Sequence, residues 1–194
     1  MGLAKRVLRD AFRFAASRAH CAPHAASSKG NRLDAVELLI RQHRALESRM
    51  KALKASTDEA ERAELLATVG DDLSVHLASE EEVFYPAVRE RRTEDILLES
   101  LEEHLSLKRL LADLLALPLD APTFAPKFQV LKEQTEHHHK EEEDHLFPKV
   151  MVLLDAEARA GLGRRMEALQ QRLQRQGDPR EAVADQTDEA APLT

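Results

Sequence analysis

The sequence predicts an all-α protein: an antiparallel up-down four-helix bundle with an N-terminal extension and a short C-terminal helix. The composition favours helix over sheet, because the 194 residues include only six glycines, one tyrosine and no tryptophan. The chain also contains an internal repeat of about 62 residues that occurs twice. Two copies of a helical hairpin that pack together make a four-helix bundle.

The repeat is centred on a short phrase, HLASEEEVFYP at residues 76–86 and HHKEEEDHLFP at residues 138–148. In both copies a histidine is followed four residues later by a glutamate and ten residues later by a proline that succeeds an aromatic residue. A lone histidine precedes each phrase, His43 in the first copy and His104 in the second. Residues i and i+4 share one face of a helix, so imidazole and carboxylate can hold one cation between them.

The first two helices follow from the spacing of apolar residues. A stripe with 3–4 spacing over residues 32–55 predicts one helix, and His43 lies in line with its apolar side chains. A Ser-Thr-Asp sequence then breaks the chain and caps a second helix, whose stripe contains His76 and Glu80. Pro86 is expected to kink or end that helix.

The next two helices repeat this arrangement. The third helix carries His104 on its buried stripe and stops at Pro118. The stretch 122–126 begins and ends with a proline and is predicted to be a loop. The fourth helix is expected to end or bend at Pro148. Its stripe contains three ionisable residues: His138, Glu142 and His145.

The flanking segments are less regular than the bundle. The N-terminal segment alternates basic and apolar residues, which suits a short amphipathic helix in weak contact with an anionic membrane, a transit peptide, or a solvated tail. Asp155 can cap a fifth helix, and the polar, proline-containing end of the chain predicts disorder. The predicted divisions are an extension (1–31), the bundle (32–154), the C-terminal helix (155–176) and a disordered tail (177–194).

Charge and composition argue against several classes of protein. The net charge of −7 disfavours binding to nucleic acid. A single cysteine, Cys21, excludes an intramolecular disulfide and a cysteine-based metal cage. No apolar run approaches the length of a transmembrane segment. We therefore expect a cytoplasmic protein.

Six ionisable residues occupy positions where the periodicity demands apolar side chains. An unpaired buried carboxylate costs several kcal/mol, and a metal ion compensates because it takes neutral imidazoles and ionised carboxylates as ligands. Four nitrogens and two carboxylates suit iron, manganese or zinc, and six ligands are too many for one tetrahedral zinc. Two metals bridged by the carboxylates fit best, and a satisfied polar network is the alternative. The candidates are His43, His76, Glu80, His104, His138 and Glu142.

The order of these motifs resembles that of the hemerythrin-like, or HHE cation-binding, domain over about residues 33–154. The resemblance implies an antiparallel four-helix bundle that holds two iron ions in an oxo- or hydroxo-bridged di-iron centre. The two glutamates would also bridge the irons. By position, the same six residues match the family's iron ligands: His43, His76, Glu80, His104, His138 and Glu142.

One position departs from the pattern of the oxygen-carrying hemerythrins, which have a second histidine four residues after the lone histidine of the third helix. Here that position is Lys108, so one iron would lack a nitrogen ligand and simple oxygen carriage is in doubt. Glu47 occupies the matching position in the first repeat. A salt bridge between Glu47 and Lys108 is one hypothesis, and Glu47 as an additional ligand is another.

Other residues of the two phrases are interpreted as secondary. The spacing to Glu142 selects His138 over its two histidine neighbours. The glutamates one residue after the candidate ligands are read as outer or solvated residues, although either could bridge. The tyrosine is read as a packing residue. These secondary residues are His137, His139, Glu81, Glu143 and Tyr85.

The resemblance leads to two functional hypotheses. In the first, the di-iron site binds or senses a small diatomic ligand, oxygen or nitric oxide, or iron itself. In the alternative, it is an enzyme that acts on peroxide or oxygen in catalase- or oxidase-like detoxification. No dedicated substrate pocket or proton shuttle is evident in the sequence, which favours binding, and no catalytic residue is assigned.

Overall fold

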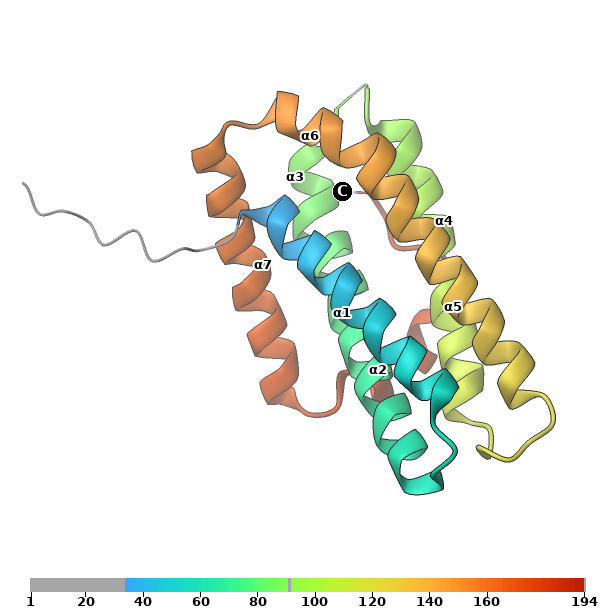
Figure 1. Cartoon of the computed structure of the whole chain (residues 1–194). Coiled ribbons are helices and arrows are strands. Elements are labelled where there is room, and N and C mark those ends of the chain that lie inside the picture. Colours follow the sequence, from blue (N-terminus) through green and yellow to red (C-terminus); the bar gives the residue numbers. More distant parts are fainter. Residues whose placement is uncertain (1–33, 91, 194) are drawn as a thin grey trace, which may run out of the picture. The chain divides into compact units, whose positions relative to one another are not determined.

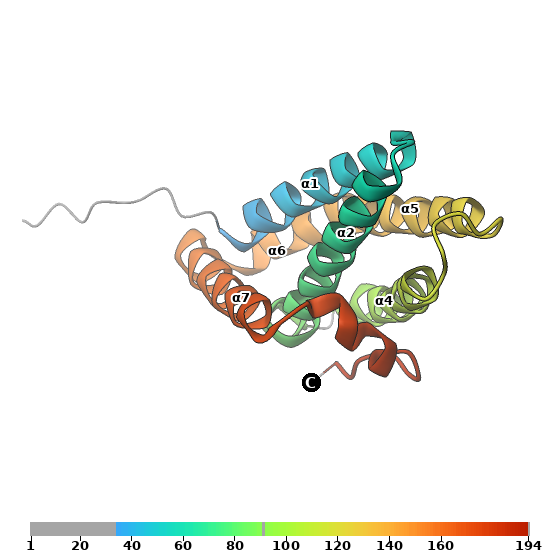
Figure 2. The same cartoon turned by 90° about the horizontal axis from the view of Figure 1, so that it is seen from below.

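Four long helices form the bundle: α1 (Ala35–Ala55), α2 (Glu59–Ser79), α4 (Glu94–Leu115) and α5 (Phe124–Glu141). The computed structural model describes residues 34–90 and 92–193, so the predicted extension, residues 1–31, lies outside the described part. Helix α1 packs against α2, and α4 packs against α5. Contacts of α2 with α4 and of α1 with α5 close the ring (Figures 1 and 2). The predicted all-helical, antiparallel bundle is confirmed.

Side-chain caps fix where the first helices begin. Asp34 Oδ1 accepts a hydrogen bond from the Glu37 backbone N–H at 3.0 Å, and the Glu37 carboxylate accepts from the Asp34 N–H. This reciprocal cap starts α1 at Ala35, three residues later than the periodicity suggested. Asp58 caps α2 in the same way by accepting from the Glu61 N–H at 2.8 Å.

Pro86 and Pro148 bend their helices without ending them. Helix α2 continues through a π-helical turn, η1 (Glu80–Phe84), into α3 (Tyr85–Val88). Helix α5 continues through η2 (Glu142–Leu146) into α6 (Phe147–Leu153). Proline has no N–H to donate, and its ring crowds the carbonyl four residues earlier. Just before each proline the helix widens, so that Tyr85 N–H donates to the Glu80 carbonyl and Phe147 N–H to the Glu142 carbonyl, five residues back. Each turn therefore contains one additional residue.

This additional residue makes the prediction for His145 wrong. In a regular helix His145 would lie on the buried stripe, but the π-helical turn rotates the following residues by about a quarter of a turn. Leu146 takes the inward position and is fully buried. The His145 side chain is 58% exposed and pairs with Glu141 at 3.4 Å.

The predicted loop over residues 122–126 is also shorter than expected. Helix α5 begins at Phe124, so Pro126 lies within its first turn. The N–H groups of the first turn have no partner inside the helix, and proline costs no hydrogen bond there. Between α4 and α5, the irregular segment runs from Ala116 to Thr123.

The apolar core consists of two clusters, one toward each end of the bundle. One contains Leu39, Phe84 and Phe147, and the other contains Met50 and Leu73 among its members. Polar residues lie on the helices between these clusters, so apolar packing shields them from water on both sides. Among the helices of residues 34–90 and 92–193, none combines the length and the hydropathy of a membrane-spanning segment.

A fifth helix and a short 3-10 helix complete the described chain. Helix α7 (Ala156–Gln176) starts after its N-cap, Asp155, and lies beside α1 and α2 (Figure 1). Gly177, with φ of 142°, reverses the chain in a conformation that favours glycine. The 3-10 helix η3 (Pro179–Gln186) then crosses α2 and α4 (Figure 2).

The end of the chain therefore differs from the predicted disordered tail. Val183 is 2% exposed within the second apolar cluster, and Arg180 binds Asp71 at 2.6 Å. The Arg109 guanidinium donates to the backbone carbonyls of Thr187 and Asp188. Polar composition alone predicted disorder, whereas one buried valine and the hydrogen bonds of two guanidinium groups hold this segment on the bundle.

Candidate metal centre

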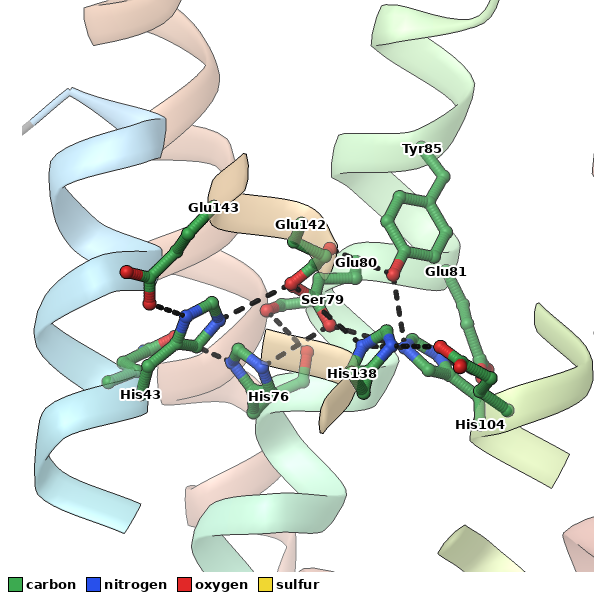
Figure 3. A network of polar contacts seen from close by, with 12 residues as sticks. His43, His76, Ser79, Glu80, Glu81, Tyr85, His104, His138, Glu142 and Glu143 are labelled. Carbon is green, nitrogen blue, oxygen red and sulfur yellow. Dashed lines mark hydrogen bonds and ion pairs between the residues drawn. The ribbon is translucent and has the colours of Figure 1, made fainter. Parts of the chain in front are cut away.

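The structure brings together the six ionisable side chains that the sequence predicted as metal ligands (Figure 3). They come from the four bundle helices and from the first residue of each π-helical turn. Each of them is at most 1% exposed to solvent. The set is His43, His76, Glu80, His104, His138 and Glu142. Ionisable groups in such a buried layer require compensating interactions.

The carboxylate of Glu80 lies near one histidine from each of the two repeats. Its Oε2 atom is 3.4 Å from Nε2 of His76, one turn earlier on the same helix. The same oxygen is 3.5 Å from Nε2 of His104, which comes from α4. A cation bound to either histidine would therefore be within reach of this carboxylate.

Glu142 occupies the matching position of the second repeat. Its Oε2 atom is 3.4 Å from Nε2 of His43 and 3.8 Å from Nε2 of His138. The site thus has a first half, His43 and His76, and a second half, His104 and His138. Both carboxylates lie between the two halves (Figure 3).

Each of the four histidines uses its Nδ1 atom to bind a neighbouring side-chain oxygen. Ionised carboxylates and amide oxygens only accept, so Nδ1 carries the hydrogen and a neutral ring presents a lone pair at Nε2. Metal-binding histidines are oriented in this way. The pairs are His43 with Glu143 (2.8 Å), His76 with Gln42 (3.2 Å), His104 with Glu81 (3.0 Å) and His138 with Glu103 (2.8 Å).

Several buried atoms of the layer have no hydrogen-bond partner among the described residues. A buried acceptor that stays unsatisfied costs about 1–3 kcal/mol. These atoms are acceptors from both repeats, and one shared cation or a pair of cations would satisfy them together. The residues therefore fit a metal site. The atoms are His43 Nε2, His76 Nε2, His139 Nε2, both Glu80 oxygens and Glu142 Oε2.

The second half has a close contact between two nitrogens. Nε2 of His104 is 3.0 Å from Nε2 of His138. Two imidazole nitrogens that bind one metal at about 2.1 Å and at a right angle are about 3.0 Å apart. Without a metal, a proton can take this place, because Glu142 and Glu103 raise the pKa of His138 although burial lowers it.

The two carboxyl groups of the layer differ in their affinity for protons. Burial and the neighbouring Glu142 raise the pKa of Glu80 well above its usual 4.5. Burial also raises the pKa of Glu142, but His138 and His43 outweigh that effect and hold it below the usual value. The pair therefore retains a proton in the metal-free chain, and a bound metal would have to displace it.

His139 is a buried member of this layer that the sequence reasoning did not select. Its ring stacks on that of His43, with centroids 3.8 Å apart and planes at 5°. Burial and His43 lower the pKa of His139 well below 6.5, which keeps the ring neutral. One of its nitrogens lies within 4.8 Å of nitrogens of His43 and His76. The repeat gave no signal for it, because the matching residue is Leu77.

The hydroxyl of Tyr85 also reaches the site (Figure 3). It donates to Oε1 of Glu142 at 3.0 Å and lies 3.1 Å from Nε2 of His104. The interpretation of Tyr85 as a packing residue accounts for its buried ring but not for this hydroxyl. The sequence did contain a signal for this hydroxyl, because the matching residue of the second copy, Phe147, has the aromatic ring and no oxygen.

The hypothesis of a salt bridge between Glu47 and Lys108 is wrong. Lys108 Nζ binds Oε2 of Glu81 at 2.7 Å, and both side chains are less than a tenth exposed. Glu47 instead binds Lys51 at 2.5 Å and is one-third exposed. Lys108 therefore holds the carboxylate that accepts from His104, and Glu47 belongs to none of the candidate ligand clusters of the described residues.

Fold and site together define the class: a metal-binding helical bundle protein. The model of a family described as the hemerythrin HHE cation-binding domain matches residues 34–150. The chain therefore belongs to this hemerythrin HHE cation-binding family. The resemblance that the sequence motifs suggested is confirmed.

Among the proteins similar to this chain are one with a solved structure and one with a higher sequence identity. A hemerythrin HHE cation-binding domain-containing protein from Mycobacterium kansasii has a solved structure that superposes with a TM-score of 0.66. It covers 79% of this chain and 98% of its own, and at 22% identity it supports the fold alone. A protein named DNA nickase from Nostoc sp. is 32% identical over 105 residues, which is 54% of this chain. The chain spans only 30% of that relative's length.

Proposed function

We propose that this chain is a non-haem di-iron protein that binds or senses a small ligand, oxygen or nitric oxide, or iron itself. One observation carries the proposal: each buried carboxylate contacts one histidine from each repeat. A single metal would leave one histidine pair without a partner. Two metals use both pairs and both carboxylates, which is the arrangement of bridged two-metal sites.

The donor set and family membership together support iron. The donor set contains imidazole nitrogens and carboxylate oxygens without sulfur, which suits iron, manganese or zinc. Family membership favours iron among these, as the sequence resemblance implied. When bound, a pair of iron ions would supply reversible coordination of small ligands and one-electron redox chemistry.

The chain's own residues would prepare the site for such a pair. Burial and the neighbouring His43 lower the pKa of His76 well below 6.5, so the ring is in the neutral form that binds metals. The Nδ1–H bonds of the histidines fix the orientation of the rings. The apolar clusters on both sides exclude bulk water. Tyr85 holds a hydroxyl hydrogen beside Glu142.

A second candidate function is an enzyme that acts on peroxide or oxygen. The Tyr85 hydroxyl favours it, because a buried O–H group that bonds both a candidate ligand and a bridging carboxylate can deliver a proton. Simple binding does not require such a donor. Nicking of DNA is a weaker candidate, since the chain matches less than a third of the relative with that name and carries a net charge of −7.

Rapid mixing of the reduced, iron-loaded protein with oxygen or with peroxide separates the two functions. Binding predicts one stoichiometric adduct that is reversed by removal of the ligand. The enzyme predicts many turnovers per site and a slower reaction in Tyr85→Phe. A protein that binds no iron under anaerobic loading would contradict both.

A further inference from the structure

His139 lies between the candidate metal centre and the protein surface. Its side chain is 95% buried and its Nε2 atom has no partner among the described residues. It nevertheless lines a surface cavity of about 360 Å³ between α1 and α5. The other candidate ligands do not line this cavity. His139 is therefore the innermost group of the cavity and an outer neighbour of His43 and His76.

The remaining lining of the cavity is rich in carboxylates. Each of its four acidic residues is paired with a lysine or an arginine, and each carboxylate keeps further oxygen lone pairs that can bind a cation. One of the acids, Glu143, also accepts the Nδ1–H of His43 and binds Arg44 at 2.5 Å. A cation in this cavity would thus find carboxylate oxygens as its first ligands and would lie beside a contact of the centre. The charged lining residues are Arg44, Glu47, Glu136, Lys140, Glu143 and Asp144.

The stacking of two rings limits what His139 can do for a bound metal. A metal lies close to the plane of each imidazole that binds it, and the His43 and His139 planes are nearly parallel with centroids 3.8 Å apart. One metal cannot lie in both planes. His139 also belongs to no candidate cluster that contains Glu80 or Glu142. The arrangement suits alternate binding, to His139 first and to His43 and the carboxylates afterwards.

We infer that His139 is a transit ligand through which divalent cations pass from the surface cavity into the centre. The buried, unpartnered imidazole takes the ion from the carboxylate-lined cavity and passes it to His43 and His76 by exchange of metal ligands. The inference rests on the proposed two-metal function. It predicts that His139 controls the rate of metal uptake and not the final metal content.

Stopped-flow mixing of the full-length metal-free chain with Co²⁺, followed by the visible absorption of the bound ion, tests the inference. His139→Ala should slow uptake by about tenfold. Loss of a residue that supports a metal ligand typically has an effect of about ten- to a hundredfold, and the lower value is expected here. His139→Phe should slow it similarly, because it retains an aromatic ring against His43 but lacks the nitrogen. His145→Ala, which removes an exposed imidazole of the same region, should take up Co²⁺ at the wild-type rate.

Metal content at equilibrium separates this inference from the proposed function. If wild-type protein binds two Co²⁺ and both His139 variants bind two more slowly, the transit role is supported. Unchanged or faster uptake in His139→Ala would overturn it, as would slow uptake in His139→Phe alone, which would indicate a steric plug. Loss of one Co²⁺ in both variants would make His139 a resident ligand and also overturn it. Fewer than two Co²⁺ in the wild type would instead contradict the two-metal proposal.

Discussion

The two halves of the candidate centre have the same ligand types but different surroundings. In the first half, the Nδ1–H of His76 binds a neutral amide, Gln42, which in turn bonds Gln170 of α7. In the second half, both histidines bind carboxylates, and Tyr85 adds a hydroxyl. The ring of His139 stacks on His43 of the first half, and among the described residues no histidine stacks in this way on the second half.

Positions at which the two copies agree supply the candidate ligands, and positions at which they differ would make two bound metals inequivalent. A carboxylate acceptor makes a histidine a stronger ligand than an amide acceptor does. We therefore expect the second half to hold its metal more tightly. The hydroxyl of Tyr85 makes the same half the better place for a ligand that needs a hydrogen bond.

The largest expected effect comes from removing a group that both halves share. Glu142→Ala should lower the iron content from two per chain to less than one, because the variant takes a bridging oxygen from both metals and leaves His43 and His138 without their contact. The absorption band of the iron centre should disappear. Metal analysis and an absorption spectrum check this, with His145→Ala as the control. Two irons retained in Glu142→Ala would refute the shared role.

A smaller effect, confined to the second half, is expected from Lys108→Met. The variant leaves the buried carboxylate of Glu81 without its cation, and breaking a buried ion pair costs about 3 kcal/mol or more. Urea denaturation of the metal-free chain measures the loss. The double variant Lys108→Met/Glu81→Gln should recover part of it, whereas equal stability of single and double variants would rule out the ion pair as the cause.

The carboxyl pair predicts that metal affinity depends on pH. The pKa of Glu80 is raised by burial and by Glu142, so its proton stabilises the metal-free fold at low pH and this stability is lost as pH rises toward the raised pKa. A metal requires the carboxylate, so binding releases the proton and tightens as pH rises, by about tenfold per pH unit for one proton. Calorimetry with Zn²⁺ in two buffers counts the protons. Glu80→Gln should release about one fewer.

The smallest effect is expected from Tyr85→Phe. Loss of the hydroxyl removes one buried hydrogen bond to Glu142, which is worth about 1 kcal/mol of stability. Iron content should stay at two per chain, since the hydroxyl is not needed to hold either metal. Thermal unfolding and metal analysis on the same samples check both statements. Loss of one iron would instead make Tyr85 a ligand of the second half.

The helices of the bundle could be predicted from the sequence because their apolar stripes have a regular period. The exceptions have local physical causes. The π-helical turns depend on where Pro86 and Pro148 deprive the backbone of a donor, and the resulting rotation exposes His145, which a constant 3.6-residue period places inside. The ordered end of the chain depends on the buried side chain of Val183 and on the hydrogen bonds of Arg180 and Arg109, which composition does not reveal.

The site could be predicted as far as the repeat reaches. The lone histidines and the two His/Glu pairs interrupt apolar stripes, and the structure brings them together. His139 and the Tyr85 hydroxyl have no counterpart in the other copy of the repeat, so a comparison of the two copies does not identify them as site residues. The partner of Lys108 lies on another helix, in Glu81, and depends on how α2 and α4 pack. Sequence spacing within one helix contains no such information.

The central claim is that the two repeats hold a pair of metals between shared carboxylates. Anomalous X-ray diffraction from crystals of the iron-loaded chain tests it most directly. The account predicts two iron positions, one beside His43 and His76 and one beside His104 and His138, with Glu80 and Glu142 in contact with both. A single iron position, or none in this layer, would contradict it.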